Sequence, residues 1–246
     1  MSLGLGIAST FPFEGVSTDL KQATSGTALG LRLWLKNDTG VTAAKWADSS
    51  GYDNHATQST EGDQAVVSGG GLDFEESEND HYDLASTIAI AENGGFCFAA
   101  VVATESSTVN SVLGKDDFDL LSIKDTNAFR FRSDTNDVTT DLIFSSDGST
   151  FPTSTKVLVL LNRSAGASNR FTFFKNGTQL TPDVDNSINA AAGQNPGGFD
   201  LNVLGTKDGS SQFFDGIIYE VAFWNRSLTA QEITDVNSYL KSIHGL

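Results

Sequence analysis

Apolar and polar residues alternate over many short segments of this chain, and turn-forming residues separate the segments. In residues 29–36 the side chains of Leu31, Leu33 and Leu35 share one face. A period of two is that of a β-strand with one buried face. Further strands are predicted at 71–75, 81–86, 95–104, 111–115, 118–124, 128–133, 139–145, 156–164 and 199–206. Many short strands with polar turns predict an all-β fold, a two-sheet antiparallel jelly-roll β-sandwich.

Turn signals support this interpretation. Asn176-Gly177 lies between two strand-like runs within 169–180 and predicts a hairpin, because both central residues of a type I′ turn need positive φ. Residues 46–59 and 183–198 are rich in turn-forming and polar residues and predict surface loops.

The stretch 217–224 is apolar at nearly every position, which predicts a strand packed on both faces. Strict alternation gives one face to Ile217, Tyr219, Val221 and Phe223. The opposite face then carries Ile218, Ala222 and Trp224, with Glu220 as the exception. Trp224 and Trp34 are both expected in the core. One face lines the space between the sheets, so another element must cover the opposite face.

A short C-terminal α-helix follows at once and is the expected cover. Thr229 as N-cap and Glu232 three residues later form a capping box, and Leu228 with Ile233 forms a hydrophobic staple. Gly245 suits the helix end. The apolar stripe consists of Ile233, Val236, Leu240 and Ile243.

Composition and charge narrow the possible partners. The 246 residues carry 31 Asp and Glu against 15 Lys and Arg, a net charge of −16, which disfavours nucleic acid as a partner. No apolar run reaches the roughly 18 residues of a membrane span, so no membrane insertion is expected. Cys97 is the only cysteine and is expected to be a small buried side chain. The N-terminus lacks the basic and apolar regions of a signal peptide.

One domain is predicted, at residues 29–246, preceded by an irregular N-terminal arm at 1–28. Within the arm, Phe11-Pro12-Phe13 is an apolar anchor. An arm of this kind is expected to dock on the body of the protein or on a neighbour, because free termini fray.

Four stretches resemble, in the right order, the laminin-G-like, concanavalin A-like jelly-roll domains. They are the loop 48–57, the strand–turn–strand 72–84, the hairpin 170–180 and the C-terminal stretch 216–233. The chain departs from that pattern at Ala56, where the family has Gly, and at Tyr219, where it often has Asp. The resemblance implies the concanavalin A-like sandwich. In many members this region holds a structural Ca²⁺, and the matching positions here are Asp48 and Asn54, with Glu220 as a further inward carboxylate.

Sugar binding is the usual function that the resemblance implies, through an aromatic platform beside Asp or Asn side chains. Trp46, Tyr52 and Tyr82 lie in or near polar loops and are the candidates. Glucanases of this architecture carry Glu-x-Asp-x-Glu on a strand, and this spacing is missing, so no enzymatic activity is expected. Glu220 needs a partner if it is buried, and a metal, Arg32 or solvent are the alternatives.

Three functions remain open. The first is a virion structural protein of a bacteriophage, located in the virion. It would act in capsid decoration, fibre or tail assembly, or host attachment, and its partners would be other virion proteins, copies of itself or a surface glycan. The second is a bacterial carbohydrate-binding module or adhesin. The third is a glycoside hydrolase, which the missing pair of strand carboxylates disfavours.

Overall fold

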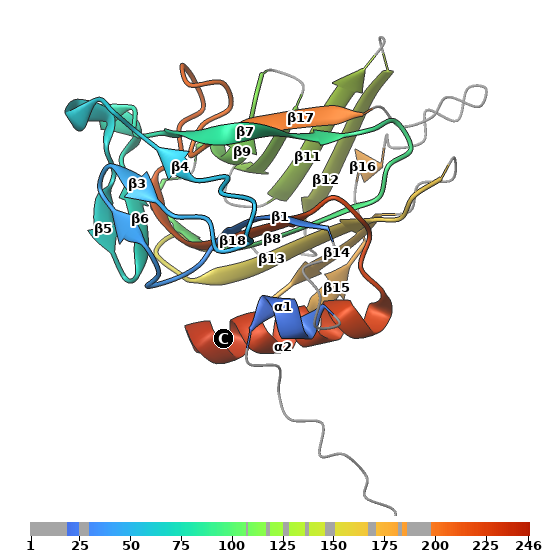
Figure 1. The fold of residues 1–246 in the computed structure, drawn as a ribbon. Coiled ribbons are helices and arrows are strands. Elements are labelled where there is room, and N and C mark those ends of the chain that lie inside the picture. The colour runs from blue at the N-terminus through green and yellow to red at the C-terminus, as the bar shows by residue number, and fades with distance from the viewer. Residues whose placement is uncertain are drawn as a thin grey trace, which may run out of the picture.

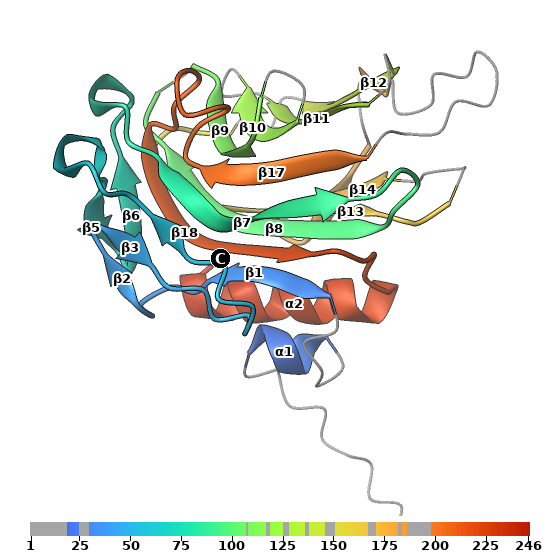
Figure 2. The same cartoon turned by 45° about the horizontal axis from the view of Figure 1, so that its top comes forward.

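Two antiparallel β-sheets pack face to face, and the helix α2 (Ala230–His244) lies against the outer face of one of them (Figure 1). The computed structural model describes residues 19–24, 30–106, 108–116, 119–124, 128–135, 138–145, 151–166, 171–181, 184–185 and 198–246. The view in Figure 2 shows the sheets as separate layers. The prediction of an all-β, two-sheet antiparallel sandwich with a short C-terminal helix is confirmed.

The sheet next to α2 is called the helix-side sheet. Its spatial order is β15 (Thr178–Leu180), β14 (Phe171–Lys175), β13 (Val157–Arg163), β8 (Phe96–Thr104), β18 (Gly216–Trp224), β6 (Gly71–Phe74) and β5 (Val66–Ser68), with β1 (Leu31–Leu35) also pairing with β18. The opposite sheet is called the distal sheet. Its order is β16 (Val184–Asp185), β12 (Val138–Ser145), β11 (Ala128–Thr135), β10 (Leu120–Lys124), β9 (Asn110–Gly114), β17 (Phe199–Leu204), β7 (Tyr82–Ile90), β4 (Ala56–Thr57), β3 (Lys45–Trp46) and β2 (Val41–Thr42).

Two apolar layers hold the molecule together. The larger layer fills the space between the sheets and is rich in Phe, with the ring centroids of Phe96 and Phe199 4.9 Å apart and those of Phe129 and Phe173 4.8 Å apart. The smaller layer lies between the helix-side sheet and α2. Each fully buried Phe or Leu contributes roughly 1.5–3 kcal/mol, so these layers dominate the stability of the fold.

The strand β18 joins the parts of the helix-side sheet. It pairs with β8 along one edge and with β6 and β1 along the other. Its register shifts between Ile218 and Glu220, which is a β-bulge. As a result Ile218 and Val221 both face the core between the sheets, whereas Ala222 and Trp224 face α2. Strict alternation therefore gave the wrong face for Ile218 and for Tyr219, because the extra residue of a bulge reverses the side-chain pattern before it.

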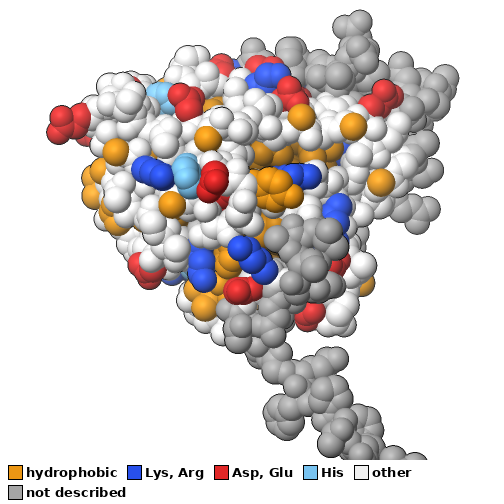
Figure 3. All heavy atoms as spheres, in the orientation of Figure 1, with side chains coloured by type: hydrophobic (Ala, Val, Ile, Leu, Met, Phe, Trp, Pro, Cys, Tyr) orange, Lys and Arg blue, Asp and Glu red, His pale blue; other side chains and the backbone are white. Residues whose placement is uncertain are grey.

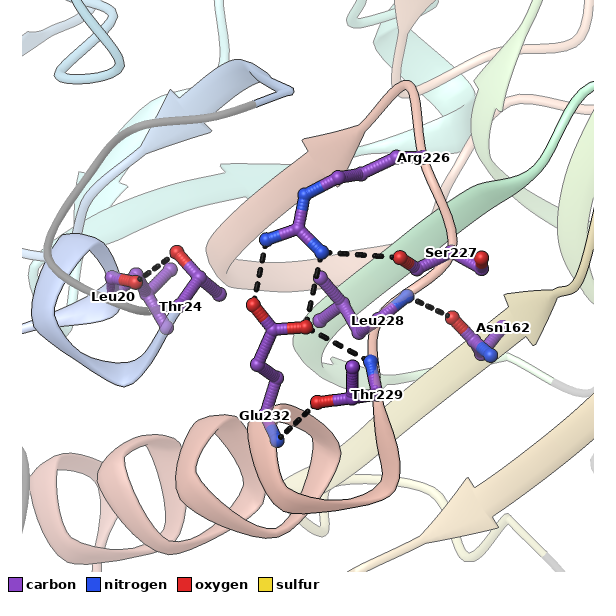
Figure 4. A network of polar contacts seen from close by, with 8 residues as sticks. All are labelled: Leu20, Thr24, Asn162, Arg226, Ser227, Leu228, Thr229 and Glu232. Atoms are coloured by element: carbon purple, nitrogen blue, oxygen red, sulfur yellow. Dashed lines mark hydrogen bonds and ion pairs between the residues drawn. The ribbon is translucent and has the colours of Figure 1, made fainter.

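The helix α2 begins as the sequence predicts (Figure 4). Thr229 Oγ1 accepts the backbone N–H of Glu232 at 3.3 Å, and Glu232 Oε2 accepts the backbone N–H of Thr229 at 2.8 Å. The Glu232 carboxylate also receives Arg226 Nη1 and Nη2 at 2.9 and 2.7 Å. The hydrogen bonds from Arg226 hold the pKa of Glu232 down at about 2. The start of the helix is thus fixed by its own cap and by an ion pair to the preceding connection.

The buried stripe of α2 differs from the prediction in one residue. Ile233, Val236 and Leu240 are buried, but Ile243 is 53% exposed, and Tyr239 takes part in the apolar layer. The buried positions Ile233, Val236 and Leu240 continue at His244, four residues after Leu240, so in the last turn of the helix the buried side chain is His244.

Glu220 is paired beneath this last turn. His244 Nε2 lies 2.8 Å from Glu220 Oε2, and Trp34 Nε1–H donates to Glu220 Oε1 at 2.7 Å. The side chains of His244 and Glu220 are only 2% and 1% exposed. Arg32, one of the partners considered for Glu220, instead stacks on Tyr52. The buried Glu220 carboxylate is thus partnered by His244, 24 residues later in the chain, and by Trp34, 186 residues earlier.

Local turn chemistry accounts for the β14–β15 hairpin, where Asn176 and Gly177 have φ of 50° and 81°. The loop predicted at 46–59 is interrupted by the short strands β3 and β4. Of the loop predicted at 183–198, only β16 and Gly198 are among the described residues.

Part of the predicted N-terminal arm is ordered on the domain. Residues 20–23 form the short helix α1 (Leu20–Ala23), where the sequence predicts irregular chain, and Leu20 and Ala23 are buried in the apolar layer beside α2. The anchor Phe11-Pro12-Phe13 lies outside the described residues. Within the part of the chain that the structure describes, no helix has the length and apolar character needed to cross a bilayer.

Candidate functional site

The loop after β3 is organised by the carboxylate of Asp48. Its two oxygens accept the backbone N–H groups of Trp34, Ser50 and Asn54 at 2.8, 2.9 and 3.0 Å, and the Ser50 hydroxyl at 2.6 Å. The Asp48 N–H in turn donates to His55 Nδ1 at 3.0 Å. Charge-assisted hydrogen bonds of this kind are about twice as strong as neutral ones. The loop is therefore held in one shape against β1.

Asn54 fixes the other side of the loop to the distal sheet. Its side chain is 4% exposed, and Oδ1 accepts the backbone N–H of Ser86 in β7 at 2.7 Å. Gly51 and Asp53 have φ of 99° and 55°, which is the tight left-handed geometry that brings the loop tip outward. Tyr52, between them, is 50% exposed.

Tyr52 stands at the edge of a pocket of about 310 Å³, called here the Tyr52 pocket. Its lining residues come from β1, the loop, β7 and the segment after β18: Arg32, Tyr52, Asn54, Ser86, Thr87, Ile88, Ala89 and Asn225. The guanidinium carbon of Arg32 lies 4.3 Å from the centre of the Tyr52 ring. Figure 3 shows a basic side chain beside hydrophobic ones at the centre of this face, between β7 and β1. The pocket combines an aromatic ring, a cation, and amide and hydroxyl groups.

Trp46 and Tyr82 do not line this pocket. Both are 0% exposed and belong to the core between the sheets. Trp46 Nε1–H donates to Lys36 O at 3.0 Å, and the Tyr82 hydroxyl donates to Ala43 O at 2.6 Å. Burial raises the pKa of Tyr82. Because β3, β4 and β7 pair side by side, these rings point inward, and neither presents a face to a sugar; of the predicted platforms only Tyr52 is accessible.

The three residues considered for calcium each have hydrogen-bond partners within the protein. Asp48 and Asn54 hold the loop, and Glu220 lies beneath α2 with His244 and Trp34. Among the described residues, no group of three or more His, Cys, Asp or Glu side chains is placed to hold a metal ion. Ca²⁺ binds six to eight oxygens. This donor set does not fit such an ion, and the calcium ion stays a prediction of the resemblance.

Arg32, Asn225 and the backbone of β7 are pocket residues that the sequence analysis did not propose. Arg32 had a visible signal, since it is the single charge within Leu-Arg-Leu-Trp-Leu. No pattern in the sequence marks Asn225 as a pocket residue. It is brought to the pocket by the pairing of β18 with β1 and by the hydrogen bond from its backbone N–H to Gly30 O at 2.7 Å.

Comparison with known proteins identifies the family to which this chain belongs. The family model described as the concanavalin A-like lectin/glucanases superfamily matches residues 76–234, more than half of the chain. The chain therefore belongs to this superfamily. No curated protein sequence matches the chain significantly.

Solved structures with the same fold include two toxin domains and a sialidase. The binding domain of Paraclostridial Mosquitocidal Protein 1 has a TM-score of 0.62 at 13% identity, covering 89% of this chain and 52% of that one. The botulinum neurotoxin serotype G binding domain has a TM-score of 0.60 at 15% identity, covering 86% and 51%. Trypanosoma rangeli sialidase in complex with sialic acid has a TM-score of 0.56 at 16% identity, covering 87% and 33%. The chain thus spans about half the length of the toxin domains and a third of the sialidase.

Proposed function

We propose that this chain is a lectin-like module that binds glycans at the Tyr52 pocket without chemical conversion. The observation that carries the proposal is the half-exposed Tyr52 ring, held by a hydrogen-bonded loop at the edge of a pocket. The apolar face of a sugar ring packs on an aromatic ring, while its hydroxyl groups need donors and acceptors such as those of Arg32 and Ser86. Membership of the superfamily and the likeness to a sialidase solved with sialic acid support the same class of ligand.

The absence of acidic groups from the pocket supports binding rather than catalysis. Glycoside hydrolysis uses a pair of carboxylates, one as acid and one as base or nucleophile. None of the described residues that line the Tyr52 pocket is Asp or Glu. Asp48, behind the loop, has both oxygens occupied by donors of the loop itself. The pocket therefore offers no general acid within the set of groups that would contact a sugar.

A glycan array with the full chain tests this function, followed by affinity measurements on the best glycan. Tyr52→Ala is expected to weaken binding about tenfold, which corresponds to ~1.4 kcal/mol. Ile243→Ala is the matched control, because it removes an exposed hydrophobic side chain on α2, away from the pocket. No glycan bound at all, or equal affinity of Tyr52→Ala and the parent, would contradict the proposal.

The bacteriophage role is kept as a narrower version of this proposal. In it the lectin-like domain sits in the virion, and residues 1–18 dock on virion proteins or on copies of the chain. The burial of Leu20 and Ala23 of α1 beside α2 supports docking of residues 19–24 of the arm within one chain. Removal of residues 1–18, which keeps α1, is expected to leave the domain folded and to abolish assembly, measured by light scattering. Unchanged assembly would remove the arm from this role.

A further inference from the structure

A second pocket lies between α2 and the outer face of the helix-side sheet. Its volume is about 590 Å³, within the range of small-molecule sites. One wall is the side of α2 that carries Ile233, Asn237 and Lys241, and the other is the outer face of β13 to β15 with Asn162 and Phe174. It is called here the helix–hairpin pocket.

The lining of the helix–hairpin pocket combines one aromatic surface with several amides. Phe174 is half-buried against the apolar layer beneath α2 and is flanked by Asn162 and Gln179 from the neighbouring strands. The Asn176–Gly177 turn lies beside Lys241 at one end. Although the chain carries a net charge of −16, none of the lining residues is acidic. The lining of this pocket suits a neutral ligand whose ring has one apolar face and several hydroxyl groups.

Two polar atoms of lining residues have no hydrogen-bond partner among the described residues. They are Thr172 Oγ1 on β14 and Asn237 Oδ1 on α2. Asn237 is 6% exposed, and its Nδ2 already donates to Ile233 O at 2.9 Å, so the free acceptor is not explained by a rotated amide. Buried polar atoms usually find a partner in the protein, in water or in a ligand, since leaving one unpaired costs about 1–3 kcal/mol. Both atoms are themselves shielded from solvent, so they lie beneath the wall of the pocket, and the groups that contact a ligand are the exposed ones around them.

The pocket is held open before any ligand binds. Leu228 N–H donates to Asn162 Oδ1 at 2.7 Å, which ties the connection to β13, and Arg226 holds Glu232 at the first turn of α2 (Figure 4). These contacts fix the first turn of α2 relative to β13. A preformed site lowers the entropic cost of binding.

We infer that the helix–hairpin pocket is a second saccharide site, which takes a neutral pyranose unit with its apolar face on Phe174. Asn162 Nδ2, Gln179 and Lys241 donate to the sugar oxygens, and the hydroxyl groups of Thr234 and Ser238 accept. Both of these hydroxyls already donate to carbonyls of the preceding turn, at 3.0 and 2.8 Å, and so keep lone pairs for a ligand. The inference extends the proposed function to a second site, and it stands without the Tyr52 pocket.

The test is an NMR titration of the full, ¹⁵N-labelled chain. The probes are free glucose, galactose, mannose, N-acetylglucosamine and N-acetylgalactosamine, each at millimolar concentration. The side-chain amide signals of Asn162, Gln179 and Asn237 are the readout. We expect at least one sugar to shift them saturably. Gln179→Ala, at an exposed edge position, should weaken that binding about threefold without unfolding the domain, and Phe174→Leu about tenfold, whereas Tyr52→Ala should leave it unchanged.

The possible results separate the two sites. Shifts at these amides that survive Tyr52→Ala support the inference even if the Tyr52 pocket binds nothing. Shifts confined to the Tyr52 pocket overturn the inference and leave the proposed function intact. No shift with any of the five sugars overturns the inference, and a glycan array that is also negative overturns both. Shifts with N-acetylglycinamide and with none of the sugars would assign the pocket to a peptide and also refute a saccharide site.

Discussion

Replacing Glu232 by Gln isolates the charge that anchors α2. A Gln side chain keeps an oxygen that can accept the Thr229 N–H, so the capping box is preserved in shape. What is lost is the bidentate ion pair to Arg226, with N–O distances of 2.9 and 2.7 Å. Glu232→Ala removes the ion pair and the bond from the Thr229 N–H to the Glu232 carboxylate, whereas the bond from the backbone N–H of residue 232 to Thr229 Oγ1 remains. The difference between the two variants is the contribution of the Glu232 half of the capping box, about 1 kcal/mol.

The size of the effect follows from the pKa. The Arg226 guanidinium lowers the pKa of Glu232 from 4.5 to about 2. A difference of this size corresponds to about 3 kcal/mol of folding free energy at neutral pH. This is an upper limit, because the Arg226 side chain is 31% exposed and solvent screens the pair. We expect Glu232→Gln to reduce the free energy of unfolding by about 1–2 kcal/mol near pH 7.

The pH dependence gives the decisive measurement. The pKa is lower in the folded state than in the unfolded state, so the stabilisation is fully present above pH 4.5 and is lost as the pH falls toward about 2. Urea unfolding of parent and Glu232→Gln between about pH 7 and pH 3 should show their difference shrinking to less than half. Asp235→Asn, which alters an exposed contact to Gln231, is the control and should change stability by less than ~0.5 kcal/mol. A difference between parent and Glu232→Gln that is constant with pH would refute the role of charge.

Three further predictions test other parts of the structure. Asp48→Ala should destabilise the domain by roughly 2–4 kcal/mol and weaken glycan binding at the Tyr52 pocket, since four donors lose their acceptor; unchanged thermal unfolding and affinity would contradict this. Gly71→Ala should destabilise by more than ~2 kcal/mol in urea unfolding, because a Cβ there would lie 2.0 Å from Ile218 O of the paired strand; a neutral effect would show that the two strands can separate freely. Burial raises the pKa of the Cys97 thiol well above 9.0, so native protein should resist a thiol reagent that labels it in urea, and rapid labelling of the native state would place Cys97 outside the core.

Features encoded within a few residues were predictable from the sequence. The capping box at Thr229 and Glu232, the Gly245 helix end and the Asn176-Gly177 hairpin all formed as expected. In each case the residues that satisfy the backbone are neighbours in sequence. The doubly packed strand was also predictable, because only an interior strand tolerates apolar side chains on both faces.

Features that depend on distant partners were not predictable. The bulge between Ile218 and Glu220 arises in the pairing with β8, and nothing within β18 marks it. The partner of Glu220 is His244, which the fold brings back beneath the sheet. Trp46 was expected in a surface loop, yet the short strand β3 places it in the core. The sequence did not distinguish Tyr52 from Trp46 and Tyr82 as a sugar-binding aromatic residue. The structure does, because Trp46 and Tyr82 are buried.

The placement of β18 has a consequence for how the polypeptide is made. Residues 216–224 lie in the middle of the helix-side sheet and bridge strands from the first half of the sequence, β1, β6 and β8. A nascent chain that has not yet emerged to residue 224 therefore exposes the unpaired edges of β8 and β6, which are prone to aggregate. Folding has to wait for nearly the whole sequence and should be slow, since its decisive pairings join segments far apart in the chain. The strand that completes the helix-side sheet is therefore among the last segments to be synthesised.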